Sequence, residues 1–227
     1  MAKVKDIQFE YKDMVTMTKS MMSELSYFKT SEEEVGPIKA TFDAGNTQFV
    51  LVTGENATGK SFVRRLYHSV MAQKKIEVIH LSQQGRSSSG IVHAMVYGDE
   101  TYNSTGCLTS RLITTGIKTC QGRETPHYII WDEPDIGLSA SFAGGVGVLI
   151  RKFVENLPKM TKGVVVISHN KDLVRQLLPV NPSHLRLGDC PDLTTWLNTF
   201  SEPADIETLE KRNYDTYKAI QGILNSK

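Results

Sequence analysis

The sequence predicts an α/β fold in which a mainly parallel central sheet is flanked by helices. Short, unbroken apolar runs of the kind buried in parallel sheets recur along the chain, and segments with helical spacing of apolar residues lie between them. Strands that alternate with helices form parallel sheets because each parallel connection needs a crossover, usually a helix. The segments expected as strands are Thr47–Thr53, Ile76–Leu81, Tyr128–Trp131 and Val164–Ile167, of which the last two are unbroken apolar runs.

The first expected strand and helix flank a glycine-rich segment. Residues 47–53 (TQFVLVT) are rich in β-branched and apolar side chains and are followed by Gly54. The segment Lys60–Gln73 has its apolar residues at helical spacing, namely Phe62, Leu66, Val70 and Met71. The order is therefore strand, loop, helix.

Further helices are expected after the later strands. Between Val146 and Asn156 the apolar residues lie on one helical face, and Lys171–Leu178 repeats that pattern after the fourth strand. The C-terminal segment 204–227 is mostly compatible with a helix that docks on the core. Its candidate packing residues are Ile206, Leu209, Tyr217, Ile220 and Leu224.

The middle of the chain has a different composition. Residues 83–124 are rich in serine, glycine and threonine, which predicts loops with one or two short helices. The segment 85–125 is therefore the expected small subdomain. Because no internal repeat or low-complexity block interrupts the pattern, we expect residues 1–227 to form a single domain.

Composition and charge exclude several classes of protein. Of the 227 residues, 40% are apolar and 22% are charged, as in one globular domain. Lysine and arginine total 26 against 25 acidic residues, so a formal charge of +1 gives nucleic-acid binding no support. The apolar runs fall far short of the roughly 20 residues that span a bilayer, and the N-terminus lacks the apolar core of a secretory signal. We therefore expect a cytoplasmic protein without membrane insertion.

The glycine-rich segment 54–61 (GENATGKS) fits the pattern G-x-x-x-x-G-K-[ST] between a strand and a helix. In a P-loop NTPase the glycines let successive backbone N–H groups curl around a phosphate, and the helix N-terminus adds its positive end. Lys60 is then expected to reach the β- and γ-phosphates of ATP, and the Ser61 hydroxyl to bind Mg²⁺. The alternative is a plain glycine-rich loop before a helix. The residues expected to contact nucleotide are Gly54, Asn56, Ala57, Thr58, Gly59, Lys60, Ser61 and Phe62.

Two carboxylates follow the third strand, where an α/β sheet exposes its ligand-binding edge. Asp132, nearest the strand end, suits the second shell of Mg²⁺. Glu133, one residue further, can point to a water in line with the γ-phosphate and is the predicted general base. The alternative is that the Asp-Glu-Pro turn only caps a helix.

With these residues the chain resembles the ATP-binding cassette (ABC) ATPases. The acid pair is followed by residues 135–139 (DIGLS), and the next strand ends in Ser168 and His169. The resemblance extends from about Phe28 to Asp189. It implies that Ser139 lies in a loop that touches a partner subunit and that His169 contacts the γ-phosphate.

The resemblance also implies a glutamine, after the second strand, that contacts the metal and the attacking water. Gln83 and Gln84 both qualify, and we prefer Gln83. An aromatic side chain usually stacks on the adenine in the transporters of this family. Tyr27 or Phe28 could serve, or either could belong to the core.

The defining signature of the family is a serine- and glycine-containing segment that opens a helix and binds the partner subunit's γ-phosphate. The best candidate is 103–107 (NSTGC), with Ser104 and Gly106 as the contacting residues and a plain helix cap by Ser104 as the alternative. The region before the acid pair is shorter than in transporter cassettes, so 85–125 resembles a reduced signature subdomain.

The function that this resemblance implies is a soluble ATPase in which ATP and Mg²⁺ join two subunits and hydrolysis releases them. Soluble relatives usually serve DNA maintenance, genome defence or translation, so the expected partners are ATP, a second copy, and a protein or DNA. The alternatives are the nucleotide-binding subunit of a transporter, an ATP-gated module that barely hydrolyses, and another P-loop machine with Arg111 or Arg123 as arginine finger.

Overall fold

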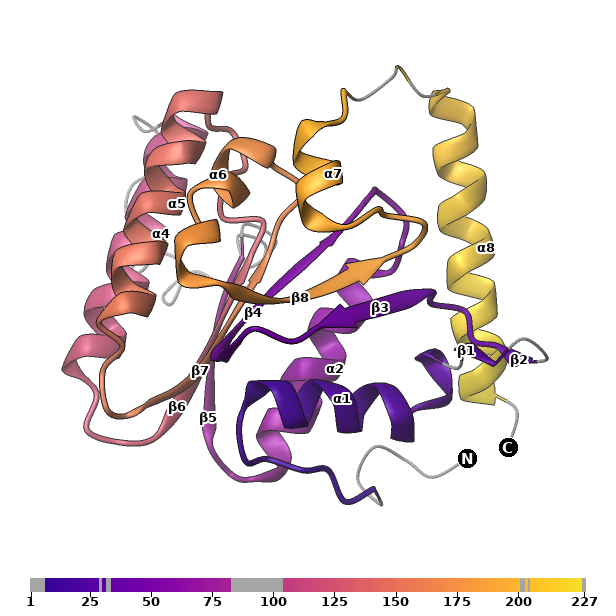
Figure 1. Ribbon diagram of the computed structural model, residues 1–227, viewed down its shortest axis with the longest axis horizontal. Helices are drawn as coiled ribbons and strands as arrows, with labels where there is room; N and C mark the ends of the chain where they lie inside the picture. The colour runs from indigo at the N-terminus through magenta and orange to yellow at the C-terminus, as the bar shows by residue number, and fades with distance from the viewer. Residues whose placement is uncertain are drawn as a thin grey trace.

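The computed structural model describes residues 7–28, 30–31, 34–82, 104–200, 203 and 205–225. These residues form an α/β structure with a six-stranded, mostly parallel sheet flanked by helices (Figure 1). The strands of the main sheet are β3 (Ala40–Asp43), β4 (Asn46–Gly54), β5 (Glu77–Ser82), β6 (His127–Asp132), β7 (Thr161–Ile167) and β8 (Pro182–Leu187). A small hairpin pairs β1 (Thr30–Ser31) with β2 (Glu34–Val35).

The α-helices are α1 (Met14–Glu24), α2 (Lys60–Gln73), α4 (Thr105–Gly122), α5 (Ala140–Glu155), α6 (Lys171–Arg175), α7 (Leu193–Asn198) and α8 (Ile206–Asn225). Two short 3-10 helices, η2 (Ser26–Phe28) and η5 (Leu178–Val180), complete the described elements. Every helix in this part of the chain is too short or too polar to cross a membrane.

The sheet order is β3-β8-β4-β7-β6-β5, and all neighbours are parallel except the antiparallel edge strand β3. The strand that enters the glycine-rich segment, β4, is therefore separated by one strand from β6, which ends in the acid pair. The strand between them is β7, which leads into Ser168 and His169. Parallel strands end at the same edge of a sheet, so these three strand ends lie next to one another.

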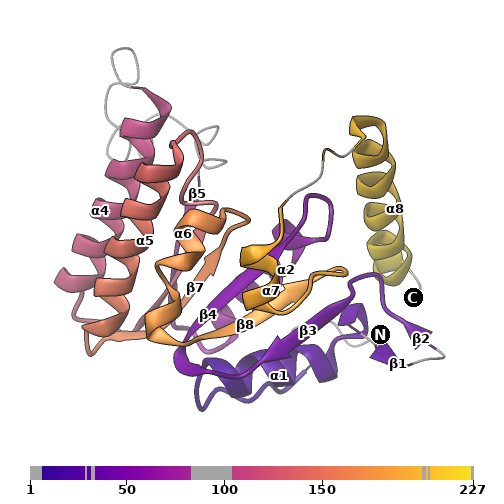
Figure 2. The same ribbon diagram turned by 45° about the horizontal axis from the view of Figure 1, so that its top comes forward.

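Each face of the sheet is covered by its own apolar core. Val50 and Val52 of β4 face a cluster that includes side chains of α1 and α2. Phe49 and Leu51 face a second cluster built with α5, α6 and α7. Figure 2 shows α1 on one side of the sheet and α6 and α7 on the other. Burial on both faces explains why these strands are unbroken apolar runs.

Helix α4 and the segment after β7 differ from the sequence-based expectation. Residues 104–125 contain one helix of 18 residues, not short helices among loops. Ile113 and Cys120 of α4 are buried in the second core cluster, so this helix belongs to the layer beside α5. The expected helix over Lys171–Leu178 ends at Arg175, and a 3-10 turn follows at Leu178–Val180.

Helix α8 forms in the expected C-terminal segment but packs less than expected. Of its apolar residues only Ile220 is buried, while Ile206 is 73% exposed, and Tyr217 and Leu224 are also exposed. Both views place α8 at the end of the molecule opposite α4 and α5 (Figures 1 and 2). There it contacts η2 and the glycine-rich segment.

Candidate functional site

The glycine-rich loop, Gly54–Ser61, joins β4 to α2 and turns sharply within a few residues. Ala57 has φ of +64° and Gly59 has φ of +94°, both in the left-handed region. Gly59 is the residue before α2, and a Cβ atom there would also lie 3.2 Å from the Ile38 side chain. The second glycine of the motif is thus required by backbone conformation.

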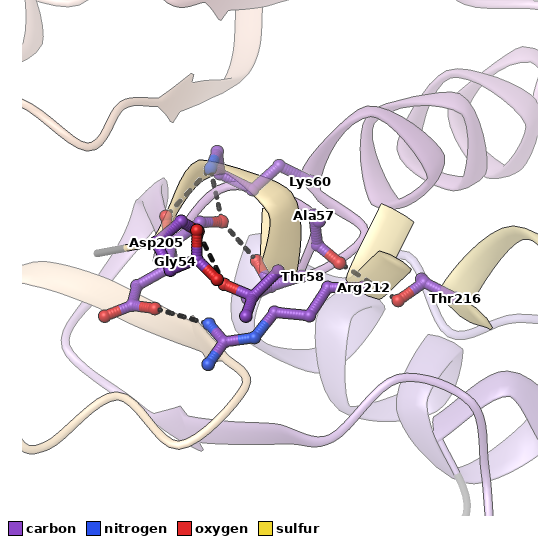
Figure 3. Close-up of polar contacts among 9 residues, drawn as sticks. Gly54, Ala57, Thr58, Lys60, Asp205, Arg212 and Thr216 are labelled. Atoms are coloured by element: carbon purple, nitrogen blue, oxygen red, sulfur yellow. Dashed lines mark hydrogen bonds and ion pairs between the residues drawn. The ribbon is translucent and has the colours of Figure 1, made fainter. Parts of the chain in front are cut away.

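The Lys60 ammonium lies buried above this loop and is 7% exposed. It donates hydrogen bonds to the carbonyl oxygens of Gly54 at 2.8 Å and Glu55 at 2.7 Å (Figure 3). Burial lowers the pKa of Lys60, although the carboxylates of Glu133 and Asp132 oppose that shift. The arrangement places a cation, held by backbone carbonyls, beside the acid pair.

Asp132 ends β6 and is 6% exposed. Its Oδ2 lies 3.3 Å from Nε of Arg64 on α2. Burial raises the pKa of Asp132, and the positive charges of Arg64 and Lys60 act against that rise. Further positive charge beside this buried carboxylate would lower its pKa and stabilise its ionised form.

Glu133 has a φ of +50°, an uncommon backbone conformation for a residue with a side chain. Its N–H donates to the Ile167 carbonyl at 2.8 Å, which fixes this residue against the end of β7. Its Oε1 lies 3.6 Å from Nδ1 of His169. The His169 imidazole and then the Lys60 charge lower the pKa of Glu133 against the effect of burial. Strained backbone of this kind clusters at functional sites.

Ser168 ties the ends of the neighbouring strands together. Its N–H donates to the Val52 carbonyl of β4 at 3.1 Å, and its hydroxyl donates to the Asp135 carboxylate at 2.9 Å. Ser168 is fully buried and Asp135 is 8% exposed. The loop after the acid pair is therefore anchored to the strand that carries His169.

Arg64 is a site residue that the sequence analysis did not select. Its side chain is 16% exposed, and NH1 lies 2.9 Å from Nε2 of His80. Burial and the Arg64 charge lower the pKa of His80 to about 4, so the imidazole is neutral and accepts this hydrogen bond. The signal in the sequence is the spacing of four from Lys60, which puts both side chains on one side of α2.

The start of α4 packs against the loop that follows the acid pair. Ser104 is the N-cap of α4, and its hydroxyl accepts a hydrogen bond from the N–H of Cys107 at 3.3 Å. Thr109 donates to the Ile136 carbonyl at 2.7 Å. A Cβ atom at Gly106 would lie 3.0 Å from the carbonyl oxygen of the residue after Ile136, so this position admits only glycine without a shift.

A cavity of about 190 Å³ lies beside the glycine-rich loop. It is bordered by Lys60, Ser61 and Glu133, and also by Asn56, Ala57, Gly59 and Phe62 of the predicted nucleotide-binding set. Thr58 instead borders a second cavity, of about 470 Å³, which Asn56 and Ala57 also border. A hydroxyl and a carboxylate, Ser61 and Asp132, fit the oxygen-rich ligand set of Mg²⁺, which keeps waters and phosphate oxygens as its other ligands.

Some of the predicted residues are not part of this arrangement. Gln83 and Gln84 lie outside the described residues; β5 ends at Ser82, which pairs in register with Asp132. Tyr27 and Phe28 are buried in the core, so neither offers a ring face to a ligand.

The two arginine candidates lie on or just after α4. Arg123 forms an ion pair with Glu77 at the start of β5, whereas Ser82 at its other end pairs with Asp132. Five residues of strand separate these ends by roughly 16 Å. Arg123 is therefore remote from the acid pair of its own chain. Arg111 is exposed on α4.

No protein-family model matches this chain, and a comparison with curated proteins also found no match.

Proposed function

We propose that this chain is an ABC-type P-loop ATPase that binds ATP with Mg²⁺ at Gly54–Ser61 and hydrolyses it with Glu133 as general base. The observation that carries the proposal is the juxtaposition of Lys60, Asp132, Glu133 and His169. Asp132, Glu133 and His169 lie at or just after the ends of β6 and β7, and Lys60 opens the helix that follows the neighbouring strand β4, within a phosphate-binding motif. A helix cap or a structural histidine would not require all four in one place.

The binding step follows from the position of Lys60. Its ammonium now donates to carbonyls of the glycine-rich loop, and β- and γ-phosphate oxygens would replace these weaker acceptors. The N–H groups at the start of α2 add donors for the same phosphates. Mg²⁺, held through Ser61 and the Asp132 side, would neutralise charge on the β- and γ-phosphates.

The hydrolysis step needs a base that is ionised at neutral pH. The pKa of Glu133 is lowered by His169 and Lys60, so the carboxylate is ionised at neutral pH, as a proton acceptor must be. A water oxygen attacks the γ-phosphorus, its proton passes to Glu133, and the bond to the ADP oxygen breaks to leave ADP and phosphate. His169, whose Nδ1 lies 3.6 Å from the Glu133 carboxylate, would donate a hydrogen bond to the γ-phosphate.

Two substitutions separate binding from hydrolysis. Lys60→Ala should abolish ATP binding in calorimetry, because the loop loses its cation. Glu133→Gln should bind ATP as the wild type does but release phosphate about 100-fold more slowly or worse, since general-base catalysis contributes that much. Lys118→Ala, at an exposed lysine of α4, is the matched control and should change neither. Wild-type affinity in Lys60→Ala, or wild-type turnover in Glu133→Gln, would refute the assignment.

A pairing surface is part of the proposal. Ser104 is exposed at the start of α4, and Ser139 is exposed just before α5. Helix α4 packs against the loop between the acid pair and α5. Phe142 on the first turn of α5 is 71% exposed. An exposed aromatic side chain on the first turn of a helix is of the kind that protein interfaces use. ATP on the glycine-rich loop of one copy would then contact the Ser104 region of the second copy.

A further inference from the structure

Helix α8 is attached to the glycine-rich loop, although the residues in contact lie 157 and 159 positions apart in the chain. The Thr216 hydroxyl donates to the Ala57 carbonyl at 3.0 Å, and Arg212 lies 3.4 Å from the Glu55 carboxylate (Figure 3). Because Ala57 belongs to the proposed phosphate site, the position of α8 is fixed relative to any nucleotide bound there. Its buried side chain Ile220 adds the apolar part of this attachment.

The same helix forms one wall of the cavity that contains Lys60 and Glu133. Tyr217 and Asn213 of α8 border it, and Phe62 and Arg65 on the first turns of α2 border it as well. Glu133 marks the end that takes the γ-phosphate. With the phosphates at the N-terminus of α2, the part of this cavity between Phe62 and α8 is left for the nucleoside.

Tyr217 is the aromatic side chain best placed to meet that nucleoside. The rings of Tyr27 and Phe62 pack edge to face with centroids 4.8 Å apart, and the Arg65 guanidinium lies 5.7 Å from the Phe62 centroid. Tyr27 is buried, and Phe62 is in contact with both neighbours. Tyr217 is 59% exposed on the wall of the cavity, so its ring face is accessible to a planar ligand.

We infer that Tyr217 stacks on the base of the bound nucleotide and that α8 thereby becomes part of the ATP site. This inference rests on the proposed function, because it takes the phosphates to lie on the glycine-rich loop. Stacking alone is tolerant of the base, since every nucleobase has a π-face. The ligand class is therefore a nucleoside triphosphate, and Tyr217 is a binding residue rather than a catalytic one.

The test compares ATP with tripolyphosphate, which has the phosphates but no base. In Tyr217→Ala the dissociation constant for ATP should rise roughly 5- to 150-fold, the equivalent of about 1 to 3 kcal/mol of stacking. Tripolyphosphate should bind Tyr217→Ala and wild type equally, and Tyr217→Phe should retain ATP affinity. Tyr214→Ala is the matched control, because Tyr214 is also an exposed tyrosine of α8 but does not border the cavity.

Hydrogen exchange gives a second readout in the full chain. ATP should slow exchange of the α8 amides, and tripolyphosphate should slow it less. Unchanged or tighter ATP binding by Tyr217→Ala would overturn the inference. Faster α8 exchange with ATP would also overturn it, because it would indicate that the nucleotide displaces α8. If wild type binds neither ATP nor tripolyphosphate, the proposed function itself fails. If Lys60→Ala loses both ligands while Tyr217→Ala keeps ATP, only the role of α8 fails.

Discussion

At the scale of single residues, Asp132 and Glu133 are neighbours in the chain whose pKa values are shifted in opposite directions. Burial raises the pKa of Asp132, with Arg64 opposing the rise. His169 and Lys60 lower the pKa of Glu133. Two carboxylates with different environments can take different roles, one toward the metal and one toward water. Since the proposed role of Asp132 needs its ionised form, we expect activity to fall as the pH falls through the raised pKa of Asp132.

Arg64→Met should move the acid limb of the ATPase pH profile to higher pH. Removing a positive charge beside Asp132 raises its pKa further, so the carboxyl is protonated earlier as pH falls. Arg64→Lys should shift the limb less, because a charge remains. The measurement is kcat/KM for ATP between pH 4.5 and 8, and Lys118→Met is the control. An unchanged acid limb in Arg64→Met would show that Asp132 does not set it.

At the scale of elements, glycines in α5 distinguish exposed helix positions from packed ones. Gly145 is exposed, and a Cβ atom there would meet nothing within 4 Å. At Gly147 the same atom would lie 2.5 Å from the Leu173 carbonyl oxygen of α6. Close contact of α5 and α6 therefore depends on one glycine and not on its neighbour two residues away.

Gly145→Ala and Gly147→Ala should consequently have opposite effects on stability. Gly145→Ala should raise the free energy of unfolding by about 0.5–1 kcal/mol, because alanine is the better helix former. Gly147→Ala should lower it by roughly 1–3 kcal/mol, because α5 and α6 must separate. Urea denaturation of both variants and wild type measures this, and each variant is the other's control. Equal effects in the two would contradict the described packing.

The elements that the sequence predicts well are those whose signal is local. The four predicted strands and α2 lie within one or two residues of their predicted bounds at most ends, because runs rich in apolar and β-branched residues and helical spacing need no tertiary information. Strand β8 (PSHLRL) was not predicted. Its buried Ser183 is satisfied by the backbone of Gly45 and Asn46, which only the folded chain brings near. Its buried His184 is likewise paired with the Thr53 hydroxyl at 2.7 Å.

The same limit applies to the candidate site. The motif spacing predicts that Lys60 and the acid pair meet at one sheet edge, and the described strand order places them there. The pairing of Arg64 with Asp132 and the return of α8 to the glycine-rich loop depend on three-dimensional packing between distant segments. The spacing from Lys60 was the only local signal for Arg64, and α8 offered none.

At the scale of the whole molecule, the proposed cycle joins two copies through ATP. The surface around Ser104, Ser139 and Phe142 adjoins the loop that follows the acid pair. That loop accepts a hydrogen bond from Thr109 of α4 and is held to Ser168 through Asp135. In the proposed cycle, these hydrogen bonds would connect the γ-phosphate end of the site to this surface. A second copy held there would bury Phe142 and bring the Ser104 region to the nucleotide.

Substitutions at the two ends of α4 provide the controls for this pairing. Ser104→Arg should prevent pairing while leaving ATP affinity unchanged, because the arginine obstructs the proposed contact of the α4 start with the second copy. Gln121→Arg adds the same charge at an exposed position near the far end of α4. This variant should pair as the protein with an unmodified α4 does. Both are best made in the Glu133→Gln background, in which ATP persists.

The most direct measurement of the central claim is the solution mass of Glu133→Gln, by light scattering behind a sizing column, with and without Mg-ATP. The account predicts one copy without nucleotide and two copies with Mg-ATP, with the doubling lost in Ser104→Arg. A mass that Mg-ATP leaves unchanged, in protein shown by calorimetry to have bound the nucleotide, would contradict it.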